Sequence, residues 1–302
     1  MRSLLINLVV FKFKMFRKLF KRFIFYSLGC EWIFLISVYV RKLIYGNYIQ
    51  CVTYHDTSFV DIESFQRQLI WYKKHFSNCN FEDLERFLNL GEWNHDRPGI
   101  IISFDDGLMS NYNVAAPLLE EFGFTGWFMI PAKAPNLHEE KQIEFAFKRR
   151  VDYDCVNLEG NVFMGWNQLK EIKARGHVIG CHSMNHIRLH DSLEANEVYE
   201  ETFESKNILE LNLQDDIRVF AWVGGELWAY GKSTYLKLLD VGYEFIFCTN
   251  CKPIKKYQDS HFLERYHVGS DFQLREVRVV LGGLYDVLYF FKRWQVSRQL
   301  SS

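Results

Sequence analysis

The stretch PGIIISFDDG, residues 98–107, joins a run of apolar residues to two acids and a glycine. The apolar run is almost uninterrupted, which is typical of a parallel strand buried on both faces. Asp105 and Asp106 come where this strand would end. Parallel α/β architectures collect their catalytic groups at the carboxyl ends of the strands. The stretch therefore predicts a buried strand with a candidate site at its end.

Apolar runs of strand length alternate with helical patterns on both sides of this stretch. Strands are expected at residues 48–55, 125–130, 177–182, 218–223 and 243–248. Helices are expected at residues 64–76, 81–90, 113–123, 165–176, 193–212 and 232–242. Repeated β-then-α units favour parallel strands with helices outside them, in a barrel or a doubly wound sheet. Residues 133–162 are polar and charge-mixed, and we expect an insertion with one short helix there.

Composition limits the class of protein. The chain has 302 residues, 48% of them hydrophobic and 17% aromatic, which is enough for a large core and argues against disorder. The formal net charge of −1 argues against nucleic acid as a partner. The seven cysteines are scattered, so no disulfide framework is expected. Cys248 and Cys251 form a C-x-x-C without a second pair, and a structural role is expected for them.

The charge is unevenly distributed along the chain. Residues 1–45 carry +8 and the remaining residues carry −9. Residues 23–40 are mostly apolar and just long enough to cross a bilayer, but Glu31 at their midpoint would cost about 2.5 kcal/mol or more there. Three arrangements stay open for this head: helices lying in the membrane interface, a single spanning anchor, or a helix packed on the protein's own body.

A basic, apolar head on an acidic body favours attachment to an anionic membrane surface. We therefore expect residues 1–47 to be a membrane-associating helical segment and residues 48–302 to be the catalytic domain. The expected location is the cytoplasmic face of the inner membrane.

Two histidines add to the site predicted from the first stretch. His182 and His186 follow the strand expected at 177–182 and lie four residues apart. Alone, such a pair is often structural, and an Asp-Gly pair is often only a turn. Two histidines and one carboxylate together, however, form a ligand set that leaves an open position for water on zinc or a similar divalent ion. The sequence therefore predicts a metal site.

SFDDG at 103–107 and HSMNH at 182–186 resemble the first two motifs of the polysaccharide deacetylases, carbohydrate esterase family four, also called the NodB homology domain. The resemblance covers roughly residues 48–285. It implies an α/β fold, a distorted (β/α) barrel, preceded here by the N-terminal helices. It also implies that Asp105 is the catalytic base. It implies that Asp106, His182 and His186 bind a divalent metal ion, with Zn²⁺ as the first choice.

VTYHDTS, residues 52–58, further resembles the branch that deacetylates poly-N-acetylglucosamine, in which the motif order is permuted. This resemblance implies that His55 is the general acid, with His267 as the second choice. Arg265 lies in LERYHVGSD, which is similar to a late L-x-R segment of the branch, and would orient Asp105; the alternative is a surface ion pair. The third motif departs from the branch, since Val223 replaces its proline.

The function that the resemblance implies is metal-dependent removal of an N-acetyl group from an amino sugar. The substrate would be a glycan or a lipid-linked saccharide of surface polysaccharide biosynthesis. Trp222 and Tyr112 are expected to contact it, and a backbone N–H near Asn111 or Tyr112 is expected to bind the oxyanion. Two alternatives are a deformylase acting on a lipid-linked formamido sugar and a catalytically silent, membrane-attached glycan-binding protein.

Overall fold

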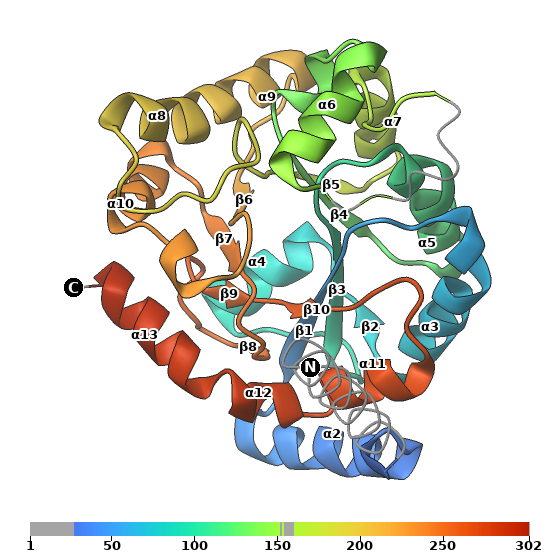
Figure 1. Cartoon of the computed structure of the whole chain (residues 1–302). Coiled ribbons are helices and arrows are strands. Elements are labelled where there is room, and N and C mark those ends of the chain that lie inside the picture. Colours follow the sequence, from blue (N-terminus) through green and yellow to red (C-terminus); the bar gives the residue numbers. More distant parts are fainter. Residues whose placement is uncertain (1–26, 152, 154–159, 302) are drawn as a thin grey trace, which may run out of the picture.

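The computed structural model describes residues 27–151, 153 and 160–301. Parallel strands form a nearly closed barrel with helices around it (Figure 1). The strand order around the barrel is β10-β1-β3-β4-β5-β6-β7-β9, and each neighbouring pair is parallel. The strands are β1 (Tyr48–Tyr54), β3 (Gly99–Phe104), β4 (Gly126–Ile130), β5 (Val178–Cys181), β6 (Val219–Ala221), β7 (Phe245–Cys248), β9 (Leu263–Glu264) and β10 (Tyr266–His267). The predicted distorted (β/α) barrel is confirmed.

Two short strands lie beside this path. β2 (Ser77–Asn78) pairs with β3, and β8 (Ile254–Lys255) runs antiparallel to β1. The helices that cover the barrel are α3 (Ile62–His75), α4 (Phe81–Leu90), α5 (Ala116–Phe122), α6 (Glu139–Arg149), α7 (Trp166–Ala174), α8 (Ala195–Tyr199), α9 (Ser205–Leu213) and α10 (Lys232–Val241), then α11 (Leu274–Leu281), α12 (Leu284–Leu288) and α13 (Phe290–Ser301). Those from α3 to α10 follow the predicted order, whereas the last three were not predicted. The insertion expected at 133–162 contains α6.

Alternate residues of each strand face two different parts of the core. Ile101 packs inside the barrel with Trp127 and Met129, whereas Ile102 and Phe128 pack outward beneath the helices. α4 adds its own apolar residues to the inner cluster. Every residue of β3 is buried, as its apolar run predicts.

The barrel closes at a seam between β9 and β10. β9 pairs with β7 and β10 pairs with β1, and Arg265 is the one residue between the two strands in the chain. The Arg265 N–H donates to the carbonyl oxygen of Cys248. Two-residue strands are too short for a periodic pattern, so hydrophobic periodicity could not predict this seam.

The N-terminal helix α2 (Glu31–Tyr45) packs on the body of the protein. Phe34 is buried against Trp71, and Arg41 donates to the carbonyl oxygen of Leu281 and pairs with Asp286 of α12 at 2.6 Å. A membrane-crossing helix needs a longer apolar stretch than any helix of the described residues offers. The amphipathic helix expected over the first twenty residues lies outside the described residues.

The outer face of α2 is exposed and apolar. Its exposed residues are Trp32, Leu35, Ile36, Tyr39, Val40, Leu43 and Ile44. Glu31 stands at the start of the helix, where it pairs with Lys74 at 2.6 Å and with Arg278 at 3.1 Å. The Glu31 carboxylate therefore lies in ion pairs at the end of α2 and not within its apolar outer face.

Candidate active site

The ends of separate strands bring the predicted site residues into one pocket of about 510 Å³. His55 follows β1, and Asp105 and Asp106 follow β3. His182 and His186 follow β5 and line the same pocket. Because the strands are parallel, their carboxyl ends all lie at the same end of the barrel. The residues that follow these ends therefore meet there, although they are more than a hundred positions apart in the chain.

Asp106, His182 and His186 form a buried group whose ligand atoms all lie within 4.8 Å of one another. Asp106 Oδ1 lies 2.9 Å from His186 Nε2 and 3.6 Å from His182 Nε2. A carboxylate and two imidazoles at such distances match the donor set of a divalent metal site with an open position.

The outer nitrogens of both histidines are fixed by carbonyl groups. His182 Nδ1 lies 2.8 Å from the oxygen of Ala221, and His186 Nδ1 lies 3.1 Å from the oxygen of Arg149. A carbonyl only accepts, so each Nδ1 carries a proton, and in the neutral form of each ring the Nε2 lone pair points inward. Asp106 Oδ1 is buried and receives no hydrogen bond of good geometry from the part of the chain that the structure describes. Lone pairs of three residues therefore face one point, an arrangement that a bound cation would stabilise.

Electrostatics at this group agree with that arrangement. Burial opposes the ionisation of Asp106, but the neighbouring His186 outweighs it, and the pKa of Asp106 falls well below its usual value. Burial also opposes protonation of His182 and lowers its pKa to about 4. The pKa of His186 is raised, because its attraction to Asp106 exceeds the effect of burial. At neutral pH the carboxylate and His182 are thus in the states that metal ligands require.

Backbone strain is concentrated in the same two loops. Asp106, Ser183 and His186 have φ values of 74°, 66° and 52°, in the left-handed region that non-glycine residues rarely adopt. Such residues cost of order 1–3 kcal/mol each and persist where the surroundings hold them. Glu201, buried in the helical segment 200–204, accepts the N–H groups of Met184 and Asn185, each at 2.9 Å.

Glu201 was not predicted from the sequence. It lies on the buried face of the helical stretch expected at 193–212, where an acid is unusual, and that position was the available signal. Burial raises the pKa of Glu201 despite the hydrogen bonds from Asn185. Its role is to hold the loop that carries His182 and His186.

Asp105 and Arg265 form a bidentate ion pair inside the barrel. Arg265 donates to Asp105 Oδ1 at 2.6 Å and to Oδ2 at 3.0 Å, and also to the hydroxyls of Thr53 and Ser103. Both partners are buried, so the alternative of a surface ion pair is wrong. Burial opposes ionisation of Asp105, but the Arg265 guanidinium overcomes this and keeps the pKa of Asp105 below its usual value. The carboxylate is therefore ionised and fixed in orientation.

Both histidines considered for the general acid line the pocket. The rings of His55 and His267 are 5.3 Å apart, edge to face. His55 Nδ1 is buried and has no hydrogen-bond partner among the described residues. The structure thus brings His55 to the site together with the second choice, His267.

Trp222 and Tyr112 do not line this pocket. Trp222 is 1% exposed and packs against Tyr230 in the outer core, so it cannot contact a substrate in the pocket. The Tyr112 hydroxyl hydrogen-bonds to Glu171 instead. The structure therefore brings neither residue to this pocket.

The backbone N–H of Asn111, expected to bind the oxyanion, is already used within the protein. The Asn111 N–H donates to the carbonyl oxygen of Leu108 at 3.1 Å, because a helical segment begins there. That N–H is therefore not available to a substrate.

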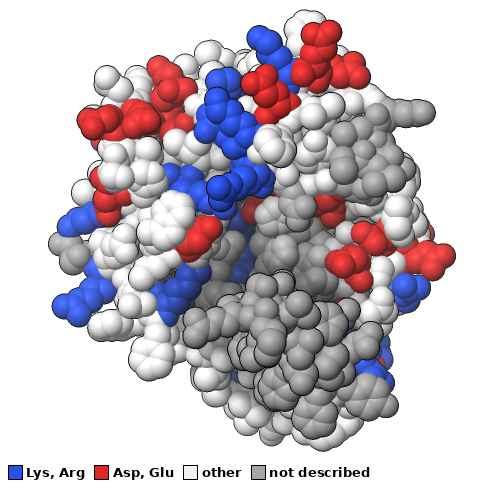
Figure 2. All heavy atoms as spheres, in the orientation of Figure 1, with Lys and Arg blue, Asp and Glu red and all other residues white. Residues whose placement is uncertain are grey.

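Three cations that the sequence analysis missed also line the pocket: Arg150, Arg188 and Lys292. Figure 2 shows Lys and Arg side chains gathered along the middle of one face, with Asp and Glu mostly toward its margins. No motif marks these residues, because they come from the insertion, from a loop and from the C-terminal helix α13.

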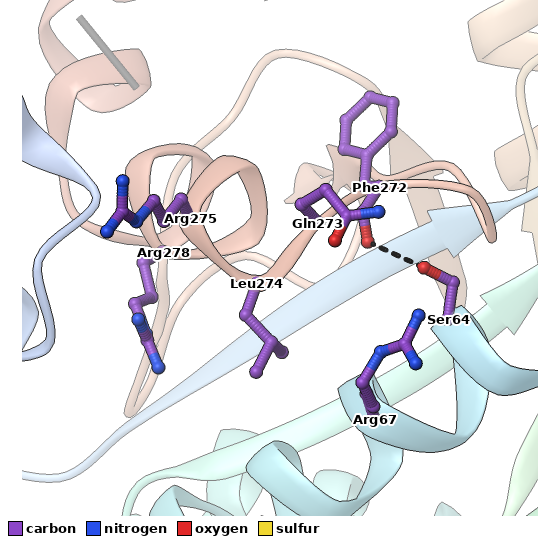
Figure 3. Close-up of a pocket in the computed structure, with 7 residues that line it drawn as sticks. All are labelled: Ser64, Arg67, Phe272, Gln273, Leu274, Arg275 and Arg278. Carbon is purple, nitrogen blue, oxygen red and sulfur yellow. Dashed lines mark hydrogen bonds between the residues drawn. The ribbon is translucent and has the colours of Figure 1, made fainter. Parts of the chain in front are cut away.

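A second hollow lies between α3 and α11, lined by Arg67, Arg275 and Arg278 (Figure 3). The three guanidinium groups point in different directions, and Arg278 already pairs with Glu31 at 3.1 Å. Ser64 donates to the Phe272 carbonyl oxygen across the hollow. These groups do not converge on a ligand.

Comparison with known proteins agrees with the site. The family model for polysaccharide deacetylases matches residues 93–246, about half of the chain. The chain belongs to the polysaccharide deacetylase family. This match includes both motifs of the site, SFDDG and HSMNH. A search of curated proteins gives no match.

Several solved structures share the fold of this deacetylase domain. The Streptococcus pyogenes deacetylase PplD in complex with acetate is 18% identical, with a TM-score of 0.62, over 78% of this chain and 98% of that one. IcaB from Ammonifex degensii is 20% identical, with a TM-score of 0.58, over 79% and 98% of the two chains. A de-N-acetylase from Aggregatibacter actinomycetemcomitans is 16% identical, with a TM-score of 0.62, over 78% and 100%. The barrel is therefore shared over nearly the whole length of these proteins.

Proposed function

We propose that this polysaccharide deacetylase removes the N-acetyl group from an amino sugar with the help of a divalent metal ion. The substrate is a glycan or a lipid-linked saccharide of surface polysaccharide biosynthesis. The observation that carries the proposal is the buried group Asp106, His182 and His186 beside the Asp105–Arg265 ion pair in one pocket. Hydrolysis of an unactivated amide needs both an activated water and a proton donor, and this pocket offers groups for each.

Asp106, His182 and His186 would hold the metal, which we propose to be Zn²⁺. Their inward lone pairs and the carbonyl contacts behind the two rings support this assignment. When bound, such an ion supplies a Lewis acid that polarises the carbonyl oxygen and makes water a nucleophile near neutral pH.

Asp105 is the general base. Because Arg265 keeps it ionised and holds both of its oxygens, Asp105 can take a proton from the attacking water. It returns to the ionised state when the pocket empties.

His55 is the general acid and protonates the departing amine, without which the C–N bond of the amide does not break. Its place at the end of β1, across the pocket from the histidine loop after β5, supports this role. His267 lies close enough to compete for the same role, and the two are separated by mutation below.

The test is release of acetate and of formate from N-acetylglucosamine oligomers and from the N-formyl analogue. Purified protein should release acetate, lose this activity with a chelator and recover it with Zn²⁺. Asp105→Asn is the matched control, because it should keep the metal and lose roughly 10²–10⁴-fold in rate. Release of formate but not acetate would replace the deacetylase by the deformylase, and full activity in chelator would refute the metal.

We further propose that residues 1–45 attach the protein to an anionic membrane surface. Their charge of +8 against −9 for the rest, and the exposed apolar outer face of α2, support this. Arg41 ties α2 to Asp286, so the attached face is rigidly joined to the barrel.

Sedimentation with phosphatidylglycerol vesicles tests the attachment. The full chain should pellet at low salt, and Leu43→Glu on the outer face of α2 should reduce the pelleted fraction. Leu211→Glu is the matched control, since Leu211 is equally exposed at 69% but lies on α9. If both variants pellet like the unmodified chain, α2 is not the attached face. A truncation should begin at residue 27, because removal of α2 would uncover the core beneath Phe34.

A further inference from the structure

The three pocket cations have no part in the proposed hydrolysis. Arg150 follows α6, Arg188 follows the histidine loop and Lys292 belongs to α13, yet all three line the same pocket as Asp105. They come from separate parts of the chain, so their meeting is not a consequence of one basic segment.

The charges around them do not balance. Of the acids that line the pocket, Glu226 is the one outside the catalytic centre, and it lies 3.5 Å from Arg188. Lys292 Nζ lies 5.1 Å from the ring centre of Tyr289, and no described carboxylate forms an ion pair with it or with Arg150. Burial lowers the pKa of Lys292. Among the residues that line the pocket outside the catalytic centre, three cations therefore face one acid, while the buried carboxylate of Glu264 also attracts Lys292.

Gly224 allows Arg188 to approach the pocket wall, and Lys292 lies beside the next residue. A Cβ at Gly224 would lie 2.9 Å from Arg188 Nε and 2.6 Å from Glu226 Oε2. A Cβ at Gly225 would lie 3.7 Å from Lys292 Nζ. Arg188 and Lys292 therefore lie beside two consecutive residues of the pocket wall, Gly224 and Gly225. These glycines follow Val223, in the third motif whose sequence departs from the branch that the chain resembles.

We propose that Arg150, Arg188 and Lys292 bind a phosphate or diphosphate group attached to the amino sugar. The proposal rests on the proposed deacetylation and names its substrate class. Guanidinium groups bind phosphate oxygens with two parallel hydrogen bonds, and a diphosphate carries enough negative charge to pair with several cations. A neutral glycan would leave Lys292, which is half-buried, without an ion-pair partner among the described residues. Both a lipid-linked sugar and a nucleotide sugar carry this chemistry.

The experiment compares three substrates with the same amino sugar on the full-length, metal-loaded enzyme. They are an N-acetylglucosamine oligomer, UDP-N-acetylglucosamine and farnesyl-diphosphate-N-acetylglucosamine. We expect kcat/KM for at least one diphosphate substrate to exceed that for the oligomer by about tenfold or more, since a hydrogen bond to a charged group contributes about 1.5–3 kcal/mol. Preference for the farnesyl compound identifies a lipid-linked sugar, and preference for the UDP compound a nucleotide sugar.

Lys292→Gln and Arg150→Gln should each reduce that preference, the ratio of the two kcat/KM values, by about tenfold. Arg67→Gln is the matched control. It also removes one cation, but Arg67 is 52% exposed and does not line the pocket. Equal kcat/KM for neutral and diphosphate substrates, or an equal effect of Arg67→Gln, would overturn the proposal.

A binding measurement separates this inference from the deacetylation itself. Calorimetry with inorganic pyrophosphate and metal-free protein should show binding that Lys292→Gln weakens about tenfold. If none of the three substrates releases acetate while pyrophosphate binds in this way, the deacetylation fails and the anion site stands. If acetate is released but pyrophosphate does not bind, the anion site fails and the deacetylation stands.

Discussion

Arg265→Gln is the change that best tests how the pocket prepares its base. The substitution removes the guanidinium from a pair in which Arg265 is fully buried and Asp105 is 3% exposed. Two charge-assisted hydrogen bonds of 2.6 and 3.0 Å are lost, and Asp105 is left as a buried charge without a partner. Breaking such a pair costs about 3–5 kcal/mol, which for a chain of this length corresponds to a fall in Tm of roughly 5–8 °C.

The pH dependence follows from the sign of the pKa shift. With Arg265 present, the pKa of Asp105 lies below its usual value, so its stabilising effect is present above about pH 3.9 and is lost as the pH falls through the lower folded pKa. Without Arg265, burial dominates and the pKa of Asp105 should rise. The stability lost in the variant should then be largest at neutral pH and smaller in acid.

The assay is the pH profile of kcat/KM for acetate release, together with metal content. The acid limb should move to higher pH in Arg265→Gln while the bound metal stays stoichiometric, because Asp106, His182 and His186 are untouched. Arg265→Lys keeps a positive charge and should restore part of the shift, which also covers the case in which the glutamine variant does not fold. An acid limb at the same pH in all three proteins would refute the role of Asp105 as the base that Arg265 controls.

The remaining predictions concern the metal, the acid and the loop support. Asp106→Ala should lose both the metal, measured by elemental analysis, and the activity; stoichiometric metal in this variant would refute the ligand assignment. His55→Ala should reduce kcat by roughly 10²–10⁴-fold and His267→Ala much less, and the reverse order in steady-state assays would exchange their roles. Glu201→Gln keeps the size of the side chain but replaces an acceptor of two N–H groups, so metal affinity should weaken roughly 10–100-fold in a competition titration.

Most of the site could be predicted from the sequence because its residues follow strands with clear local patterns. Asp105 and Asp106 end an apolar run, and His182 and His186 end another. The parallel arrangement then places these ends together without further information. The strand boundaries agree within a few residues for the same reason.

The motif around Trp222 led to a substrate contact being expected there, although the strand pattern indicates a different position. On β6 the inward residues are Val219 and Ala221, which pack inside the barrel, whereas Phe220 packs outward. Alternation therefore directs Trp222 outward as well, into the core beneath the helices. The alternation of side chains along the strand therefore predicts that Trp222 points away from the barrel interior, whereas the comparison of motifs does not.

Glu201 and Lys292 could not be predicted, because their positions depend on tertiary packing. Glu201 lies in a helix, and only the docking of that helix brings it under the histidine loop. Lys292 depends on how α13 returns along the barrel after the seam. The position of Glu201 on the buried face of its helical stretch marks it as unusual but not as the support of the histidine loop, and no pattern within α13 marks Lys292.

Arg265 joins barrel closure to the state of the proposed base. It lies between β9 and β10, whose two-residue pairings with β7 and β1 provide little hydrogen bonding of their own. Its guanidinium reaches Thr53 on β1, Ser103 on β3 and Asp105, so the side chain links the seam to the strands across the interior. Because a buried arginine without a charged partner is unfavourable, the seam is more stable when Asp105 is ionised. The fold therefore selects the protonation state that proton abstraction from water requires.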